Sequence, residues 1–140
     1  MDSWQSSNLT ESIMAVARRV RRSHMSALKP LGLNPSQSRA MHVLARAEES
    51  VRLRDLADHL RIGPRSATEV VDSLESANLV SRRADPTDRR AVLVDLTETG
   101  RGVLDRINDA RRHVSADLFD VLEPAERAEL NRLMSKIMDG

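Results

Sequence analysis

The sequence contains no cysteine and almost no aromatic residues. The absence of cysteine excludes disulfide bonds, thiolate metal sites and thiol-based redox sensing. Trp4 and Phe119 are the only aromatic side chains, so we expect an aliphatic core. No run of about 18 apolar residues, the length that a membrane span needs, is present. The amino terminus has no basic start followed by an apolar run, so we expect a cytoplasmic protein without a secretory signal.

Lysine is scarce too. Of the 22 basic residues among 140, 20 are Arg and 2 are Lys, and 21 acidic residues leave a net charge of +1. The codon usage of a GC-rich genome would account for this arginine excess, so the arginine count alone does not predict nucleic-acid binding. A DNA-binding protein need not be strongly basic overall if its arginines gather on one face. The length predicts a single domain over residues 1–140.

Hydrophobic periodicity predicts a mainly α-helical fold with a small β-hairpin. Apolar residues recur every three to four positions, as on one face of a helix, in six segments: 8–29, 34–47, 53–60, 64–77, 98–122 and a last helix after Pro124. Between them the period changes to two, which predicts strands over 79–84 and 91–96. The turn chemistry of Asp85-Pro86-Thr87-Asp88 joins these strands into a hairpin.

Several residues indicate where the helices begin and end. Asn34 before Pro35 is typical of a helix N-cap and first turn. Thr97 is expected to cap the helix after the hairpin, and Asn78 to adopt the left-handed conformation that ends a helix. The long helices at both ends carry more apolar surface than a small domain covers, which predicts a homodimer. In the last helix we expect four residues to face inward: Leu130, Leu133, Ile137 and Met138.

Two helical segments, 53–60 and the one from Pro64, have the layout of a helix-turn-helix. In such a motif the second helix enters the major groove of DNA with its first turn. That turn leaves Arg65, Ser66 and Thr68 directed outward, where they can reach bases or phosphates. An ordinary pair of helices with a solvated polar face is the alternative interpretation.

The hairpin that follows carries arginines at its entry and at its tip. Arg82 and Arg83 enter it, and Asp88-Arg89-Arg90 close the tip. An arginine on a narrow ribbon suits the minor groove, whose negative potential attracts guanidinium groups. We expect Asp88 to hold the guanidinium of Arg90 by a charge-assisted hydrogen bond. The alternative is a charged turn that protects an edge strand from pairing with another chain.

At these residues the sequence resembles the multiple antibiotic resistance regulator (MarR) family. The resemblance rests on Leu-Ala-Asp-His-Leu at 56–60, on Val-Val-Asp-Ser-Leu-Glu-Ser-Ala-Asn-Leu-Val at 70–80, and on the hairpin. The most specific stretch runs from Asp85 to Gly100, and the similarity of layout covers nearly the whole chain. The resemblance implies a winged helix-turn-helix over 34–96, flanked by dimerisation helices at 8–30 and 98–140.

The resemblance also implies a function and a set of site residues. A homodimer would bind a near-palindromic double-stranded operator as a transcriptional repressor, without a cofactor. A small molecule, often a phenolic acid or lipophilic anion, would bind in a pocket and cause the protein to release the DNA. This pocket is expected at His24, Met41 and His42. The expected DNA contacts are Ser38, Arg54, Pro64, Arg65, Ser66, Thr68, Glu69, Arg82, Arg83, Asp88, Arg89 and Arg90.

Two residues depart from the family pattern. Glu69 stands where many members carry a basic or neutral residue. Its carboxylate can accept a hydrogen bond from a cytosine amino group or repel a phosphate, so we expect an unusual operator. Asn78 replaces the more usual glycine, which is conservative because asparagine tolerates the same backbone conformation.

Two other functions stay open at this point. A winged-helix module can bind a protein partner in place of DNA, and a regulator of this type can respond to a metal. Asp109 and His113, four positions apart on one helix, would supply half of a zinc site. The histidines are otherwise scattered, which favours unrelated surface or cavity positions, and we expect no metal. No glycine-rich phosphate loop, nucleophile elbow or pair of catalytic carboxylates is present, so we do not expect an enzyme.

Overall fold

The computed structural model describes the backbone of residues 2–140 and the side chains of residues 8–140. The chain divides into two compact units. Unit 1 combines the residues before Met25 with Ala110–Gly140, and unit 2 is Met25–Asp109. Helices α1 (Asp2–Leu28) and α5 (Glu98–Phe119) each contribute residues to both units. No helix in the described part of the chain is long and apolar enough to span a membrane.

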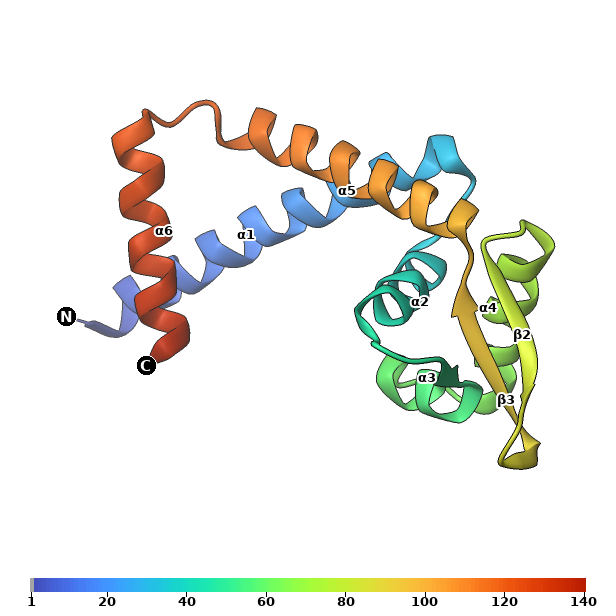
Figure 1. Ribbon diagram of the computed structural model, residues 1–140. Coiled ribbons are helices and arrows are strands. Elements are labelled where there is room, and N and C mark those ends of the chain that lie inside the picture. The colour runs from blue at the N-terminus through green and yellow to red at the C-terminus, as the bar shows by residue number, and fades with distance from the viewer. Residues whose placement is uncertain (1) are drawn as a thin grey trace. The chain divides into compact units, whose positions relative to one another are not determined.

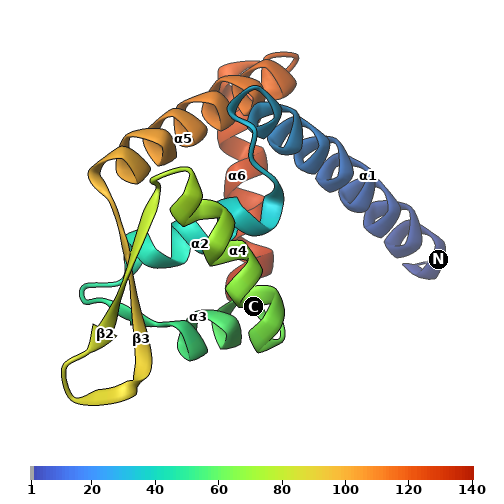
Figure 2. The same cartoon turned by 90° about the vertical axis from the view of Figure 1, so that its right-hand side faces the viewer.

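Unit 2 contains a helix-turn-helix followed by a β-hairpin, the wing (Figure 1). Helix α2 contacts both α3 and α4, and α3 packs on α4. Both views of the ribbon show the wing extending past α3 and α4, with its turn at the far end (Figures 1 and 2). Between α1 and α5 the elements are the 3-10 helix η1 (Lys29–Leu31), α2 (Pro35–Arg46), β1 (Val51–Arg52), α3 (Leu53–Leu60), α4 (Pro64–Ser76), β2 (Val80–Asp85) and β3 (Asp88–Leu96).

The sheet has three antiparallel strands in the order β1-β3-β2. Strand β1 pairs with β3 and places Arg52 opposite Leu93. Strand β2 pairs with β3 along its whole length, with a register shift between Ala84 and Asp85 that brings Asp85 opposite Asp88. The sequence did not predict β1, because a period of two cannot be recognised in two residues.

The predicted signals at the helix ends are confirmed. Asn34 caps α2: its side chain accepts a hydrogen bond from the backbone N–H of Gln37, and the Gln37 side chain accepts one from the backbone N–H of Asn34, both at 2.9 Å. Asn78 has a positive φ of 60°. Thr97 caps α5, because its hydroxyl oxygen accepts a hydrogen bond from the backbone N–H of Gly100 at 2.9 Å.

Some predicted boundaries are wrong. Strand β2 is shifted by one residue towards the turn, and β3 begins three residues earlier than expected, so only Pro86 and Thr87 lie between them. Helix α1 already includes Asp2, and α5 ends at Phe119 instead of continuing to 122. The break between α3 and α4 has its positive φ, 55°, at Arg61. These boundaries depend on backbone pairing and packing, which local residue preferences predict only loosely.

The core of unit 2 is aliphatic, as predicted. Met41 of α2, Leu56 of α3 and Leu74 of α4 are fully buried, together with Val94 of β3 and Ile107 of α5. Burying a side chain of this size stabilises the fold by about 1.5–3 kcal/mol. The helix-turn-helix and the base of the wing therefore share one core.

Unit 1 is different, because none of its side chains at 8–24 and 110–140 is fully buried. Helix α6 (Pro124–Asp139) has no buried residue at all. The prediction that its apolar residues face inward is wrong for the single chain: 43% of Leu133, 62% of Ile137 and 76% of Met138 are exposed. The apolar stripe of α1 is exposed as well, at Ile13 and Val16 among others.

Candidate nucleic-acid interface

The first turn of α4 presents polar side chains to solvent. The fully buried Ala67 fixes the face of the helix that packs on the core. Thr68 is only partly exposed, and its hydroxyl donates a hydrogen bond to the backbone carbonyl of Pro64 at 2.9 Å. Towards a ligand the Thr68 oxygen is therefore an acceptor. The exposed predicted residues of this helix are Pro64, Arg65, Ser66 and Glu69.

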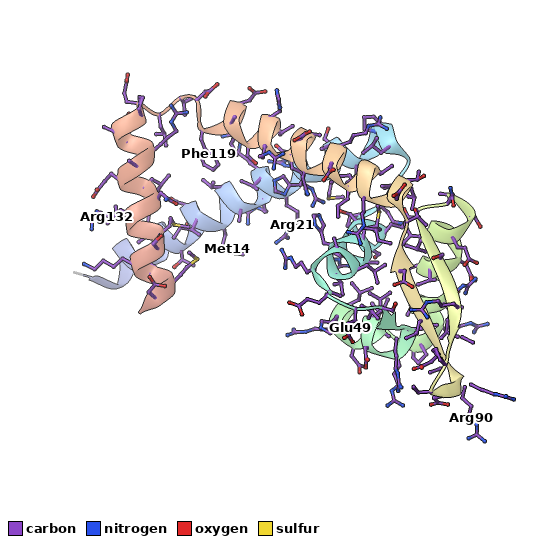
Figure 3. All side chains as sticks on the ribbon, viewed as in Figure 1. Met14, Arg21, Glu49, Arg90, Phe119 and Arg132 are labelled. Carbon is purple, nitrogen blue, oxygen red and sulfur yellow. The ribbon has the colours of Figure 1, made fainter. Side chains whose placement is uncertain are left out.

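The tip of the wing presents two arginines. Arg89 and Arg90 are exposed, and neither guanidinium has a hydrogen bond or ion pair with another side chain of residues 8–140. Figure 3 shows Arg90 at the far end of the hairpin, directed away from the protein. Asp88 accepts a hydrogen bond from the backbone N–H of Arg90 at 3.0 Å. The predicted contact between Asp88 and the Arg90 guanidinium is therefore wrong, because this carboxylate closes the turn.

Two predicted contacts lie outside α4 and the wing. Arg54 is exposed in the first turn of α3. Ser38 of α2 is fully buried, so the prediction that it contacts DNA is wrong. The physical reason is the helical period: Ser38 lies three residues before Met41 and shares its buried face.

Arg82 on β2 turns back onto α4. Its backbone N–H and its guanidinium donate hydrogen bonds to Glu75 at 3.1 and 3.0 Å, and the guanidinium lies 2.7 Å from the Asp72 carboxylate. The hydrogen bonds from Arg82 lower the pKa of Glu75, and the Glu75 and Asp72 carboxylates raise the pKa of Arg82. This side chain therefore connects the wing to helix α4 within the protein.

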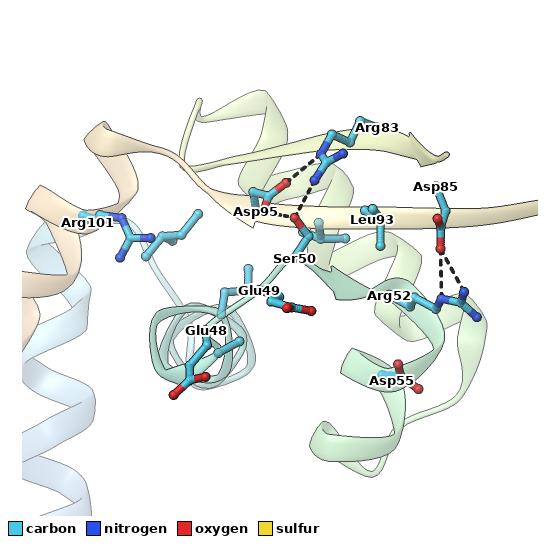
Figure 4. A pocket seen from close by; sticks show the side chains of 14 residues that line it. Glu48, Glu49, Ser50, Arg52, Asp55, Arg83, Asp85, Leu93, Asp95 and Arg101 are labelled. Carbon is cyan, nitrogen blue, oxygen red and sulfur yellow. Dashed lines mark hydrogen bonds and ion pairs between the residues drawn. The ribbon is translucent and has the colours of Figure 1, made fainter. Parts of the chain in front are cut away.

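Arg83, the next residue on the strand, faces the other side of the sheet, where its guanidinium contacts Ser50 and Asp95 (Figure 4). Its Nη2 donates a hydrogen bond to the hydroxyl of Ser50 at 2.7 Å, and its Nε lies 3.3 Å from Asp95 on β3. The Ser50 hydroxyl in turn donates to Asp95 at 2.5 Å. The base of the wing is thus fastened to the segment that leads into β1, although 55% of the Arg83 side chain stays exposed.

A third arginine, Arg52, reaches the outer part of the wing. Its guanidinium donates hydrogen bonds to Asp85 at 2.9 and 3.1 Å. Asp85 also accepts hydrogen bonds from the backbone N–H and hydroxyl of Thr87, and these, followed by the charge of Arg52, hold the pKa of Asp85 below its usual value. Sequence reasoning missed this contact, because Asp85 resembled an ordinary turn residue and nothing local indicated its partner 33 positions away.

A hollow of about 700 Å³ lies beside these ion pairs (Figure 4). Buried leucines, Leu93 and Leu96, form part of its lining. Charged side chains of both signs complete it, among them Glu48, Glu49 and Arg101.

The residues predicted to form an effector pocket occupy different environments. Met41 is fully buried in the core of unit 2, so the prediction that it lines an open pocket is wrong. His42 is partly buried on the same helix. His24 belongs to unit 1, where its Nε2 makes a hydrogen bond with the Ser115 hydroxyl at 3.2 Å. Burial, followed by the positive charge of Arg111, lowers the pKa of His24.

Among the described residues, no group of three or more histidine, aspartate or glutamate side chains is placed to hold a metal ion. Asp109 and His113, the pair from the sequence, belong to different units, Asp109 to unit 2 and His113 to unit 1.

Helices α3 and α4 with the three-stranded sheet define a winged helix-turn-helix protein. Comparison with known proteins gives the family. The sequence model of the MarR family matches residues 31–91. The uncharacterised HTH-type transcriptional regulator YkoM of Bacillus subtilis is 30% identical over 108 residues, which cover 77% of this chain and 70% of YkoM. The HTH-type transcriptional repressor MdtR of the same species is 23% identical over 133 residues, 94% of this chain and 84% of MdtR. This chain belongs to the MarR family.

Solved structures agree with this assignment. Wild-type apo MarR from E. coli is 25% identical and has a TM-score of 0.81, with 92% of this chain and 95% of MarR covered. A mutant of MepR from S. aureus, bound to an oligodeoxyribonucleotide, shares the fold at 17% identity with a TM-score of 0.75, covering 94% and 96% of the two chains. The protein is therefore a DNA-binding transcriptional regulator and not an enzyme.

Proposed function

We propose that this regulator is a homodimeric repressor that binds a near-palindromic operator in the cytoplasm and leaves it when a small molecule binds. Each chain places the first turn of α4 in a major groove and the wing tip against the neighbouring minor groove. The observation that carries the proposal is the exposed pair Arg89 and Arg90 at the end of the wing, on the same unit as the exposed turn of α4.

Charge supports the DNA contact. Among residues 8–140, the guanidinium groups of Arg54, Arg65, Arg89 and Arg90 have no side-chain partner. An arginine without an internal partner can neutralise a phosphate and release its counterion, which makes the affinity depend on salt. Arg82 and Arg83 have internal partners, so we expect them to contribute mainly by holding the wing. MepR, which has the same fold, is bound to an oligodeoxyribonucleotide in its solved structure.

Exposed apolar side chains support the dimer. In unit 1, Leu9, Ile13, Leu133 and Ile137 are each between 36% and 62% exposed in the single chain. Large apolar side chains exposed in such number are typical of an interface in a soluble protein. A second copy of the chain is the partner we propose, because a twofold dimer presents two winged domains to the two halves of a palindrome. The terminal helices, predicted at 8–30 and 98–140, would form this interface.

The proposed effector is a small organic molecule. A phenolic or lipophilic anion is the class that the resemblance implies. Of the predicted pocket residues, His24 of unit 1 and His42 of unit 2 are each only partly buried. A metal-responsive regulator lacks such support, because no group of three or more histidine, aspartate or glutamate side chains among the described residues is placed to hold an ion.

Binding to DNA selected from a random double-stranded pool tests the proposal. We expect dissociation constants in the nanomolar range that weaken steeply with salt. Arg90→Ala should lower the affinity by roughly 1–3 kcal/mol, or about 5–150-fold, if the side chain reaches base edges.

Arg46→Ala is the matched control. Arg46 is an exposed arginine at the end of α2 without a side-chain partner in the described chain, and it is not a predicted contact. Equal affinities of the two variants would remove Arg90 from the interface. If the folded wild type binds no double-stranded DNA even at low salt, DNA binding is refuted and a protein partner becomes the better interpretation.

A further inference from the structure

The outer part of the wing is held by a side chain from the start of the helix-turn-helix. We propose that this contact, the wing anchor (Arg52, Asp85 and Thr87), positions Arg89 and Arg90 for DNA. The inference rests on the proposed DNA binding of the wing. It assigns Arg52 and Asp85 as positioning residues that themselves make no contact with DNA.

Asp85 uses both carboxylate oxygens in the wing anchor. Oδ2 accepts hydrogen bonds from Nε and Nη2 of Arg52 at 3.1 and 2.9 Å. Oδ1 accepts hydrogen bonds from the backbone N–H and the hydroxyl of Thr87 at 2.9 and 2.8 Å. Only 7% of the Asp85 side chain is exposed. A carboxylate with so little access to water depends on these donors, so losing either partner leaves a poorly solvated charge.

Arg52 stands where the sheet meets the helices. It is the residue immediately before α3, and it lies opposite Leu93 in the β1–β3 pair. Because β3 lies between β1 and β2, the Arg52 side chain crosses β3 to reach Asp85 on β2 (Figure 4). Asp85 is the last residue of β2, directly after the register shift and opposite Asp88. The wing anchor therefore connects the first helix of the motif to the turn that carries the tip.

Holding this turn matters because a two-stranded hairpin is only marginally stable by itself. In both views of the ribbon the tip extends beyond α3 and α4 (Figures 1 and 2). A tip with many orientations loses more conformational entropy when DNA selects one of them. Fixing Asp85 and Thr87 reduces that loss for Arg89 and Arg90.

The sign of one substitution separates this proposal from simple electrostatics. Asp85→Asn removes a negative charge from the part of the protein that faces phosphates. If only net charge mattered, this variant would bind DNA more tightly. The wing anchor predicts weaker binding, because an amide cannot replace a carboxylate that accepts four hydrogen bonds.

The experiment measures the affinity of purified full-length variants for one selected double-stranded site by fluorescence anisotropy at fixed salt. We expect Asp85→Asn and Arg52→Ala each to bind about tenfold more weakly than the wild type, as for the loss of one specific contact. Arg46→Ala, which also removes one exposed guanidinium, should stay within about twofold. Unchanged or tighter binding by Asp85→Asn, or equal affinities of Arg52→Ala and Arg46→Ala, would overturn the proposal.

A double-mutant cycle tests whether the wing anchor acts through the tip. In a protein that already carries both Arg89→Ala and Arg90→Ala, we expect Arg52→Ala to lower the DNA affinity by less than about twofold. The reason is that the guanidinium groups which Arg52 positions are gone. An undiminished tenfold loss in that background would show that Arg52 acts elsewhere, for example on a phosphate, and would sink the inference.

Two checks keep the result interpretable. Urea denaturation of every variant shows whether it is folded. If Arg52→Ala is not folded, Arg52→Lys replaces it in the cycle, and its loss of affinity must likewise shrink in the variant that lacks both tip arginines. A lysine keeps the charge but loses the two-donor geometry of the guanidinium. The DNA affinity of Arg52→Lys should therefore lie between that of the wild type and the tenfold weaker affinity expected for Arg52→Ala. If the folded wild type fails to bind DNA, the proposed function falls; if it binds and the variants match it, only the wing anchor falls.

Discussion

Gly100→Ala should destabilise the protein although it adds a good helix former to a helix. Gly100 lies in the first turn of α5, and its backbone N–H donates a hydrogen bond to the Thr97 cap. A Cβ atom at this position would overlap the backbone carbonyl oxygen of Leu79 and come within 2.8 Å of a methyl carbon of Leu96. The obstacle is backbone, so it cannot turn away as a flexible side chain would.

Two opposing effects determine the size of the change. Replacing glycine by alanine inside a helix stabilises it by roughly 0.5–1 kcal/mol. Inserting a carbon into packed structure costs about 1–3 kcal/mol. Moving α5 away would also stretch the hydrogen bond from Thr97 N–H to the same Leu79 oxygen, now 3.0 Å long, worth about 1 kcal/mol. The clash wins, and we expect a net loss of roughly 1–3 kcal/mol.

Gly102→Ala is the matched control, two residues further along the same helix. A Cβ atom at Gly102 would meet no atom within 4 Å beyond its chain neighbours and its own helix backbone, so only the helix propensity acts and the variant should gain up to about 1 kcal/mol. Urea denaturation at one protein concentration compares the two, since the stability of a dimer depends on concentration. If Gly100→Ala were as stable as Gly102→Ala, the close approach of α5 to Leu79 would be wrong.

Three further predictions concern other parts of the chain. Ile137→Asp should convert the proposed dimer into a monomer, because it puts a charge in place of an apolar side chain that is 62% exposed in the single chain. An unchanged mass in light scattering would exclude α6 from the interface. Asn78→Ala should lower the stability to urea by about 1 kcal/mol and Asn78→Gly should not, because the φ of 60° suits glycine and strains alanine; equal midpoints would contradict this reading. Burial lowers the pKa of His24 in the folded state below the ordinary 6.5, and Arg111 adds to the effect. The unfolded chain then binds the proton more readily, so the free energy of unfolding should fall as the pH drops through 6.5 towards the lowered pKa. Urea midpoints at several pH values should depend less on pH in His24→Gln. An unchanged slope would argue against His24 as the cause of the pH dependence.

Much of the fold follows from local chemistry and could be predicted. The helical periods, the Asn34 cap and the left-handed Asn78 depend on residues within one turn of each other, so the sequence contains their whole explanation. The same holds for the change of period that predicted the wing. The exposed arginines at its tip follow from the turn, because a short turn at the end of a hairpin has nothing to pack against.

The roles of other site residues could not be predicted, because they depend on partners that are distant in sequence. Arg82 and Arg83 are adjacent, yet one reaches α4 and the other reaches Ser50, since successive residues of a strand face opposite sides of the sheet. Ser38 was expected at the DNA because the resemblance to the family implied that contact. Its position on the buried face of α2 overrode its chemistry.

The sequence by itself determined that this chain has a winged helix-turn-helix with arginines at the wing tip, because caps, turns and periods are short-range properties. Only the tertiary structure decided which arginines are available to DNA. Arg89 and Arg90 have no side-chain partner in the described chain, whereas Arg52 is committed to Asp85, 33 positions away. A guanidinium binds whichever carboxylate the fold brings within reach, and that proximity exists only after β1, β2 and β3 have assembled.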